Sequence, residues 1–132
     1  MSCVCCLSLT ADLGEITRNI LLHFIDASLL FDGYSSDILN THYGFDASFV
    51  SAVEATQDPK DVQAVIVKHL GLDEEHVTDD CAAIVQWACR IVAARAAALA
   101  ACAIAAVIQH TGNDKVPEGE EDTGVDVGLD GR

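Results

Sequence analysis

The longest stretch of this chain without a helix breaker runs from Thr78 to Gly112, and it limits the fold more than any other feature. Asp79 and Asp80 follow Thr78 at its start, where the helix dipole favours negative charge. Gly112 is typical of the residue just past a helix end. The stretch therefore predicts a single helix over about 79–110, roughly 48 Å long at 1.5 Å per residue.

Within this helix, residues Ile91 to Ile108 are apolar except for Arg95, and they nearly reach the length of a membrane span. Two properties argue against a span. The charge of Arg95 would lie well inside the bilayer, and alanine, which dominates here, gains little from transfer into lipid. Because small side chains let helix backbones approach closely, we predict a soluble helix packed on neighbouring elements, with no membrane partner.

A second helix is predicted near the start of the chain, over about 12–30. Asp12 with Glu15 three residues later matches a capping box, in which each side chain bonds a free backbone N–H of the first turn. A turn at Asp32-Gly33 ends the segment, and residues 33–45 are predicted to be a polar loop. The apolar face of this helix has helical spacing and comprises Ile16, Ile20, Leu21 and Phe24.

Two shorter helices lie between these long ones. Asp46 is a plausible cap for a helix over about 46–55, from Ala47 onwards. Asp58 followed by Pro59 predicts a helix over 59–70 that Gly71 ends, because proline fits the first helical position. The apolar face of the 59–70 helix comprises Val62, Val65, Ile66, His69 and Leu70.

The C-terminal residues predict a short strand over about 124–130. Val125, Val127 and Leu129 alternate with polar or small residues, and Asp130-Gly131 is typical of a turn. The fold class is therefore mainly α with one short C-terminal β-strand.

Composition places the chain among folded, acidic proteins. A length of 132 residues favours one domain, and a hydrophobic fraction of 51% argues against disorder. The net charge of −14 repels phosphate backbones, so we expect no nucleic-acid partner. The start of the chain lacks the basic and long apolar regions of a signal peptide, and we predict a cytoplasmic protein.

The cysteines and acidic residues do not predict a disulfide framework or a metal site. Cys81, Cys89 and Cys102 lie along one predicted helix and cannot cross-link to each other. The cluster of Cys3, Cys5 and Cys6 has no His or second Cys pair nearby to complete a zinc site. The acidic repeat of Asp122, Asp126 and Asp130 lacks the glycine and the final glutamate of a calcium-binding loop.

Three motifs resemble the hexokinase family, most closely its fungal glucokinase-like members. These are Leu13-Gly-Glu-Ile16, Arg18-Asn-Ile-Leu-Leu22 and the alanine-rich run that begins at Arg95. The resemblance covers residues 12–132, and residues 1–11 fit no part of the family pattern and are expected to be an unrelated leader. It implies a partial segment of the large domain of an actin-like, ribonuclease H-like α/β ATPase.

The resemblance also implies a function and a nucleotide site. Hexokinases transfer the γ-phosphoryl group of ATP, held with Mg²⁺, to glucose or another hexose in the first step of glycolysis. In the family, the serine that matches Ser51 lies near the nucleotide, and a strand delivers the residues that match Asp130 and Gly131 to the adenosine. Without the family, Ser51 is an ordinary residue of a short helix and Asp130-Gly131 an ordinary turn.

The chemistry needs a carboxylate to accept the hydroxyl proton and groups that hold the phosphates. The family motifs that supply them, Asn-Asp-Thr-x-Gly and Asp-x-Gly-Gly-Thr, do not occur in this sequence. We therefore assign no catalytic residue and expect the chain alone to be inactive. The alternative is a non-catalytic helical protein that binds a partner through its alanine-rich helix. If the chain is instead a piece of a larger domain, apolar helix faces lie exposed, and we expect such a chain to self-associate.

Overall fold

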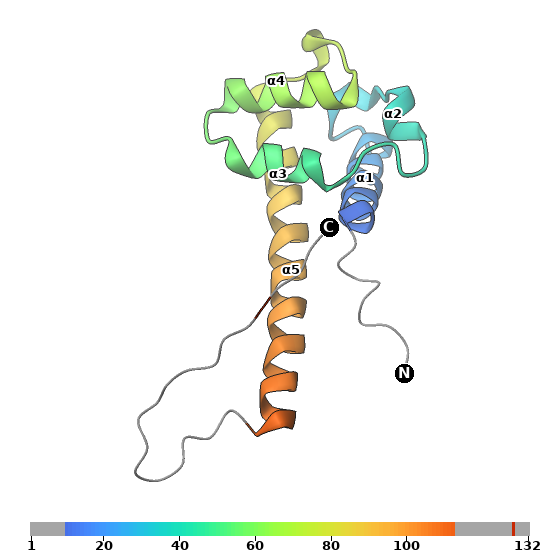
Figure 1. Ribbon diagram of the computed structural model, residues 1–132. Helices are drawn as coiled ribbons and strands as arrows, with labels where there is room; N and C mark the ends of the chain where they lie inside the picture. Colours follow the sequence, from blue (N-terminus) through green and yellow to red (C-terminus); the bar gives the residue numbers. More distant parts are fainter. Residues whose placement is uncertain (1–9, 113–127, 129–132) are drawn as a thin grey trace.

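The computed structural model describes residues 10–112 and Gly128, and this part of the chain is helical (Figure 1). α1, α3 and α4 pack on the first part of α5, whose other end projects away from them. We call residues 12–93 the head and residues 94–111 the shaft. The α-helices are α1 (Thr10–Asp26), α2 (Asp37–Asn40), α3 (Ala47–Ala55), α4 (Pro59–Leu70) and α5 (Asp79–Thr111), and 3₁₀ turns lie at Phe31–Gly33 and Glu74–His76.

The core lies in the head, and all five α-helices contribute to it. α1 and α3 contact each other as well as α5, and α4 contacts α3. These contacts remove the apolar side of each helix from water, which is the main source of helix stability in a small domain. The fully buried core side chains include Leu21, Leu30, Phe31, Leu39, Phe49, Val53, Ile66, Leu70, Val85 and Cys89.

The predicted ends of α3 and α4 are confirmed. The carboxylate of Asp46 accepts a hydrogen bond from the N–H of Ser48, and that of Asp58 accepts one from the N–H of Lys60. Gly71 ends α4 in the left-handed conformation, with φ of 65°. On the apolar face of α4, Val62, Ile66 and Leu70 are buried, while Val65 and His69 are half-buried.

The predicted long helix is also confirmed, as α5 over Asp79–Thr111. The hydroxyl of Thr78 accepts a hydrogen bond from the N–H of Cys81, and Gly112 ends the helix with φ of 75°. The side chain of Gln86 donates to the carbonyl of Thr56 over 2.8 Å and ties α5 to the end of α3.

The first helix differs from the prediction at both ends. α1 begins before Asp12, so Asp12 lies inside the helix and the predicted capping box is wrong. α1 ends at Asp26 rather than near residue 30. Beyond it the backbone turns through positive φ values at Ser28 and Phe31, and this turn brings Leu30 and Phe31 into the core. Burial of two large apolar side chains therefore outweighs the local helical pattern.

The region 33–45, predicted to be a loop, contains the four-residue helix α2. Ser36 caps it by accepting a hydrogen bond from the N–H of Leu39. α2 is short, but it places Leu39 fully inside the core. The sequence prediction missed this helix because one turn of helix leaves no periodic pattern.

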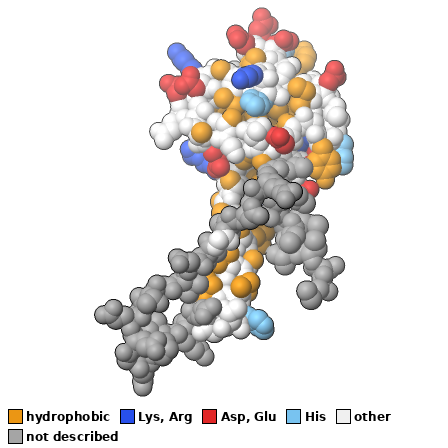
Figure 2. All heavy atoms as spheres, in the orientation of Figure 1, with side chains coloured by type: hydrophobic (Ala, Val, Ile, Leu, Met, Phe, Trp, Pro, Cys, Tyr) orange, Lys and Arg blue, Asp and Glu red, His pale blue; other side chains and the backbone are white. Residues whose placement is uncertain are grey.

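The shaft contradicts the prediction of a closely packed alanine-rich helix. None of residues 94–111 is buried, and hydrophobic side chains run down this part of the molecule (Figure 2). By length and composition α5 is able to cross a membrane, with only 6% of the apolar window buried. Core helices of soluble proteins share this length and composition, so these two properties alone do not assign the shaft to a membrane.

The predicted strand over about 124–130 falls outside the described residues except for Gly128, which is exposed. Residues 10–112 contain no strand. The helical part of the predicted fold class is thus confirmed, and the strand stays a prediction.

Candidate functional site

Ser51 lies on α3, one turn after the cap Asp46, and its side chain is exposed. Its neighbours Val50 and Val53 face the core, so the helix itself turns the Ser51 hydroxyl towards solvent. The hydroxyl has no hydrogen-bond partner among the described residues. It is therefore available to a ligand.

The other two predicted nucleotide-site residues, Asp130 and Gly131, lie outside the described residues. Of the three predicted nucleotide-site residues, the structure describes Ser51 alone, and the grouping of the three stays a prediction.

A buried ion pair on α1 is the most elaborate polar arrangement of the head. Two nitrogens of Arg18 donate to the two carboxylate oxygens of Glu15, Nε to Oε2 over 2.7 Å and Nη2 to Oε1 over 2.6 Å. The side chains of Arg18 and Glu15 are only 7% and 11% exposed. Such a bidentate contact fixes both side chains more tightly than a single hydrogen bond would.

The remaining polar atoms of this pair hold the segment that follows α2. Arg18 Nη1 donates to the carbonyl of Leu39 over 2.6 Å, and the N–H of Tyr43 donates to Glu15 Oε2 over 2.9 Å. The side chain of Asn19 donates to Glu15 Oε1 over 3.1 Å, and His42 Nε2 lies 3.2 Å from the same oxygen. The pair thus joins α1 to residues 39–43, more than 20 positions along the chain.

These hydrogen bonds stabilise the charged form of Glu15. The bonds from Arg18 contribute most, followed among the favourable effects by the N–H of Tyr43 and the side chain of Asn19. Against the opposing effect of burial, they lower the pKa of Glu15 from 4.5 to about 2. Glu15 is therefore an ionised structural group at neutral pH, which makes it a poor general base.

Gly14 brings the backbone of α1 against the start of α3. A Cβ atom at this position would lie 2.4 Å from the carbonyl oxygen of Phe45 and 2.7 Å from Cα of Asp46. Only glycine allows this approach, because real Cβ atoms do not come so close to backbone atoms. Gly14 and Glu15 are adjacent on α1, and both therefore contact the segment that leads into the α3 cap. Ser51 lies on this same helix, α3.

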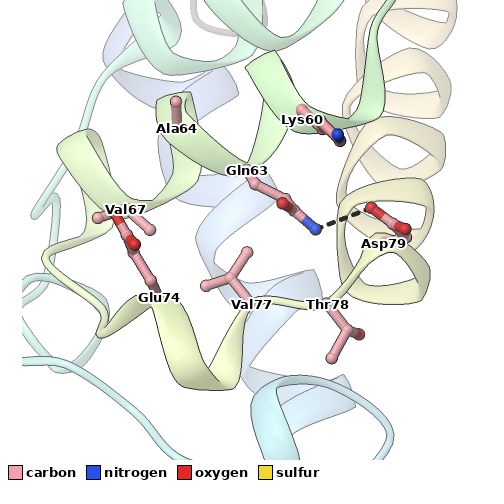
Figure 3. Close-up of a pocket in the computed structure, with 8 residues that line it drawn as sticks. All are labelled: Lys60, Gln63, Ala64, Val67, Glu74, Val77, Thr78 and Asp79. Atoms are coloured by element: carbon pink, nitrogen blue, oxygen red, sulfur yellow. Dashed lines mark hydrogen bonds between the residues drawn. The ribbon is translucent and has the colours of Figure 1, made fainter.

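An open pocket of about 630 Å³ lies between α4 and the start of α5 (Figure 3). Lys60, Glu74 and Asp79 place charges of both signs around it, and Gln63 Nε2 donates to Asp79 Oδ1 over 2.9 Å across it. Ser51 does not line this pocket.

A second, apolar pocket lies where α1 meets α5. Phe24, Leu29, Ile84 and Trp87 line it, and Leu29 and Trp87 are 62% and 55% exposed. The rings of Phe24 and Trp87 lie 6.2 Å apart. Ile91, one turn further along α5 towards the shaft, is also exposed.

The described cysteines and acidic residues form no evident reactive centre. Cys81, Cys89 and Cys102 are free thiols, and burial raises the pKa of Cys89 to about 12, which makes it unreactive. Within residues 10–112 no three His, Cys, Asp or Glu side chains gather as a metal site. The cluster Cys3, Cys5 and Cys6 lies outside the described residues.

The described part is thus a helical scaffold that presents Ser51, and the comparisons with known proteins give it a family. A family model described as Hexokinase matches residues 11–132. The chain is 40% identical to Hexokinase-2 of Equus caballus over 121 residues, 38% identical to human Hexokinase-2 over 119 residues and 36% identical to human Hexokinase-1 over 121 residues.

This chain belongs to the hexokinase family. Each of the three alignments covers 90% of the chain but only 12% of the relative, so the chain spans 12% of the length of the curated relatives it matches. Family membership fits a piece of a larger domain. The relatives named here are mammalian, and the closer likeness to fungal glucokinase-like members stays a prediction.

The sequence interpretation missed the structural role of Glu15 and Arg18. Their spacing of three residues on a helix was a usable signal, because side chains at i and i+3 are neighbours. The sequence pattern instead favours a capping box for Glu15, which the structure does not contain. The approach of residues 39–46 was not visible in the sequence, because it depends on the turn after α1.

Proposed function

We propose that the chain is part of an enzyme that transfers the γ-phosphoryl group of ATP to glucose or another hexose, the first step of glycolysis, in the cytoplasm. The observation that carries this proposal is the match to the hexokinase family along residues 11–132. The free thiols among the described cysteines are consistent with a reducing compartment.

In this proposal the chain contributes scaffold and one edge of the nucleotide site. The exposed hydroxyl of Ser51, which has no partner among the described residues, fits a hydrogen bond to ATP. Asp130 and Gly131 complete this edge by family resemblance. Mg²⁺ would neutralise the phosphates when bound with ATP, and residues 10–112 offer it no cluster of carboxylates, so its ligands are assigned to other parts of the enzyme.

We expect the 132-residue chain to be inactive by itself. The family motif that supplies the catalytic base does not occur in this sequence, and the hydrogen bonds from Arg18 lower the pKa of Glu15 to about 2. The test is a coupled assay of ADP formation by the pure chain with ATP, Mg²⁺ and glucose, with human Hexokinase-2 as the positive control. Glucose-dependent turnover that persists through purification would contradict the assignment of no catalytic residue.

The exposed shaft favours a second candidate, a non-catalytic protein that binds a partner through the alanine-rich helix. Leu99 and Val107 on the shaft are 40% and 62% exposed, and no residue between 94 and 111 is buried. A chain that self-associates or melts over a broad range supports the role as part of a larger domain. A monomer with a sharp, cooperative melt favours the independent interaction protein.

A further inference from the structure

We propose that the buried Glu15–Arg18 pair is a positioning device for the nucleotide edge, holding residues 39–46 so that α3 presents Ser51 in one fixed place. The inference rests on the proposed function, because it takes Ser51 as a nucleotide contact. It assigns Glu15 and Arg18 a role in substrate binding without any contact to substrate.

The first step is the connection from α1 to the segment. Glu15 accepts from the N–H of Tyr43, and Arg18 donates to the carbonyl of Leu39, so the pair holds the segment at two backbone atoms. Both side chains are buried, and the donors and acceptors of the pair point at each other and at this segment. Backbone contacts of this kind fix position rather than merely filling space.

The second step is the connection from the segment to Ser51. Residues 43–46 run directly from the N–H held by Glu15 to the cap of α3, Asp46. Gly14 of α1 lies against Phe45 and Asp46, which prevents this stretch from sliding along α1. Ser51 follows Asp46 by five residues on a rigid helix, so a shift of the cap moves its hydroxyl by a similar distance.

The third step separates positioning from simple stability. Phe49 and Val53 already anchor α3 in the core, so the helix has apolar contacts that do not involve the ion pair. Loss of the pair should therefore loosen the segment before α3 more than it unfolds the head. A shift of about 1 Å at a binding group is enough to change affinity or rate strongly.

The test compares Glu15→Gln with Val62→Ala in the full 132-residue chain. Glu15→Gln keeps the side-chain shape but removes the charge that Arg18 and Tyr43 bind. Val62→Ala is the matched control, because Val62 is buried on α4 and makes no hydrogen bond to the segment. If Glu15→Gln does not fold, Arg18→Lys replaces it. Arg18→Lys keeps the positive charge but loses the bidentate contact of the guanidinium group with Glu15.

Two measurements are made where all variants are fully folded. Hydrogen exchange of the Tyr43 amide reports the position of the segment, and titration with ATP and Mg²⁺, followed by the NMR signal of the Ser51 amide, reports binding. We expect Glu15→Gln to speed Tyr43 exchange and to weaken ATP binding, each by about tenfold. Val62→Ala should change neither measurement by more than about twofold, although it lowers the melting temperature.

The outcomes distinguish the two proposals. ATP binding that is unchanged in a folded Glu15→Gln chain, or weakened equally by Val62→Ala, overturns the positioning role. A wild-type chain whose Ser51 signal does not respond to ATP overturns the nucleotide role of Ser51, and the positioning proposal with it. A wild-type response that Glu15→Gln weakens selectively, together with faster Tyr43 exchange, supports both.

Discussion

The two halves of α5 share one helix but differ in what holds them. In the head, packing against α1, α3 and α4 buries one side of α5, whereas the shaft has no buried residue. The shaft is at least as apolar in sequence as the covered half, so hydrophobicity did not decide which half is covered. The shaft instead relies on the high helix propensity of alanine. The buried α5 side chains, all in the head, are Cys81, Ala82, Val85, Ala88, Cys89 and Val92.

The largest expected contrast between head and shaft comes from truncating an apolar side chain in each. Phe49→Ala removes a side chain that is 0% exposed and should lower the free energy of unfolding by roughly 3–5 kcal/mol. Val107→Ala, at a residue 62% exposed, should change it by less than about 0.5 kcal/mol. Urea unfolding followed by circular dichroism gives both values. Equal losses would mean that the shaft is covered as well as the head.

Acid should also affect the stability of the two regions differently, because the head contains Glu15 and the shaft contains no carboxylate. The pKa of Glu15 is lowered from 4.5 to about 2 in the folded chain, so its ionised form stabilises the fold at pH values above 4.5. This contribution is lost progressively as the pH falls from 4.5 through about 2.

Glu15→Gln should therefore lower the free energy of unfolding by about 3 kcal/mol at neutral pH, since it leaves Arg18 buried without its charged partner. The variant should also lose stability less steeply than the wild type below pH 4.5. Urea titrations at several pH values measure both effects. Parallel pH curves for the two proteins would show that the ion pair does not set the acid response.

Gly14→Ala tests close backbone approach against helix propensity. The new Cβ atom would lie 2.4 Å from the carbonyl oxygen of Phe45, and we expect a loss of about 2 kcal/mol despite the better propensity of alanine. On the shaft alanine should instead be more stabilising than glycine, so we expect Ala98→Gly to cost about 1 kcal/mol of helix stability. Thermal melts followed by circular dichroism compare the two. A stabilised Gly14→Ala chain would show that α1 and the start of α3 are not in contact.

The smallest effect concerns the cap of a short head helix. Asp58→Ala removes the acceptor for the N–H of Lys60 and should cost about 1 kcal/mol, whereas Asp58→Asn, which still caps, should cost little. α4 depends on its cap more than α5 does, because it has only 12 residues. Chemical unfolding of the two variants measures the two losses in stability. Similar losses in both would assign the effect to charge rather than to capping.

Local signals in the sequence predicted the ends of α3, α4 and α5 well. Asp46, Asp58 and Thr78 each cap the helix that follows, and Gly71 and Gly112 end helices in the left-handed conformation. Each of these signals acts within four residues, so the sequence alone contains the information.

Features that depend on distant contacts were not predictable in the same way. The end of α1 is set by burial of Leu30 and Phe31 in a core formed by other helices. The exposure of the shaft depends on which elements lie beside it. For the candidate site, the sequence identified Ser51 through family resemblance, but the link from Glu15 to the segment before α3 required the fold.

Trp87 gives this chain an optical reporter at the boundary between head and shaft. It is the single tryptophan of the sequence, it is 55% exposed, and its ring lies 6.2 Å from that of Phe24. Its fluorescence therefore arises from one known place on the apolar surface. Anything that covers this surface, whether a second copy or another part of a larger domain, should shift the emission to shorter wavelength, so association can be followed without a label.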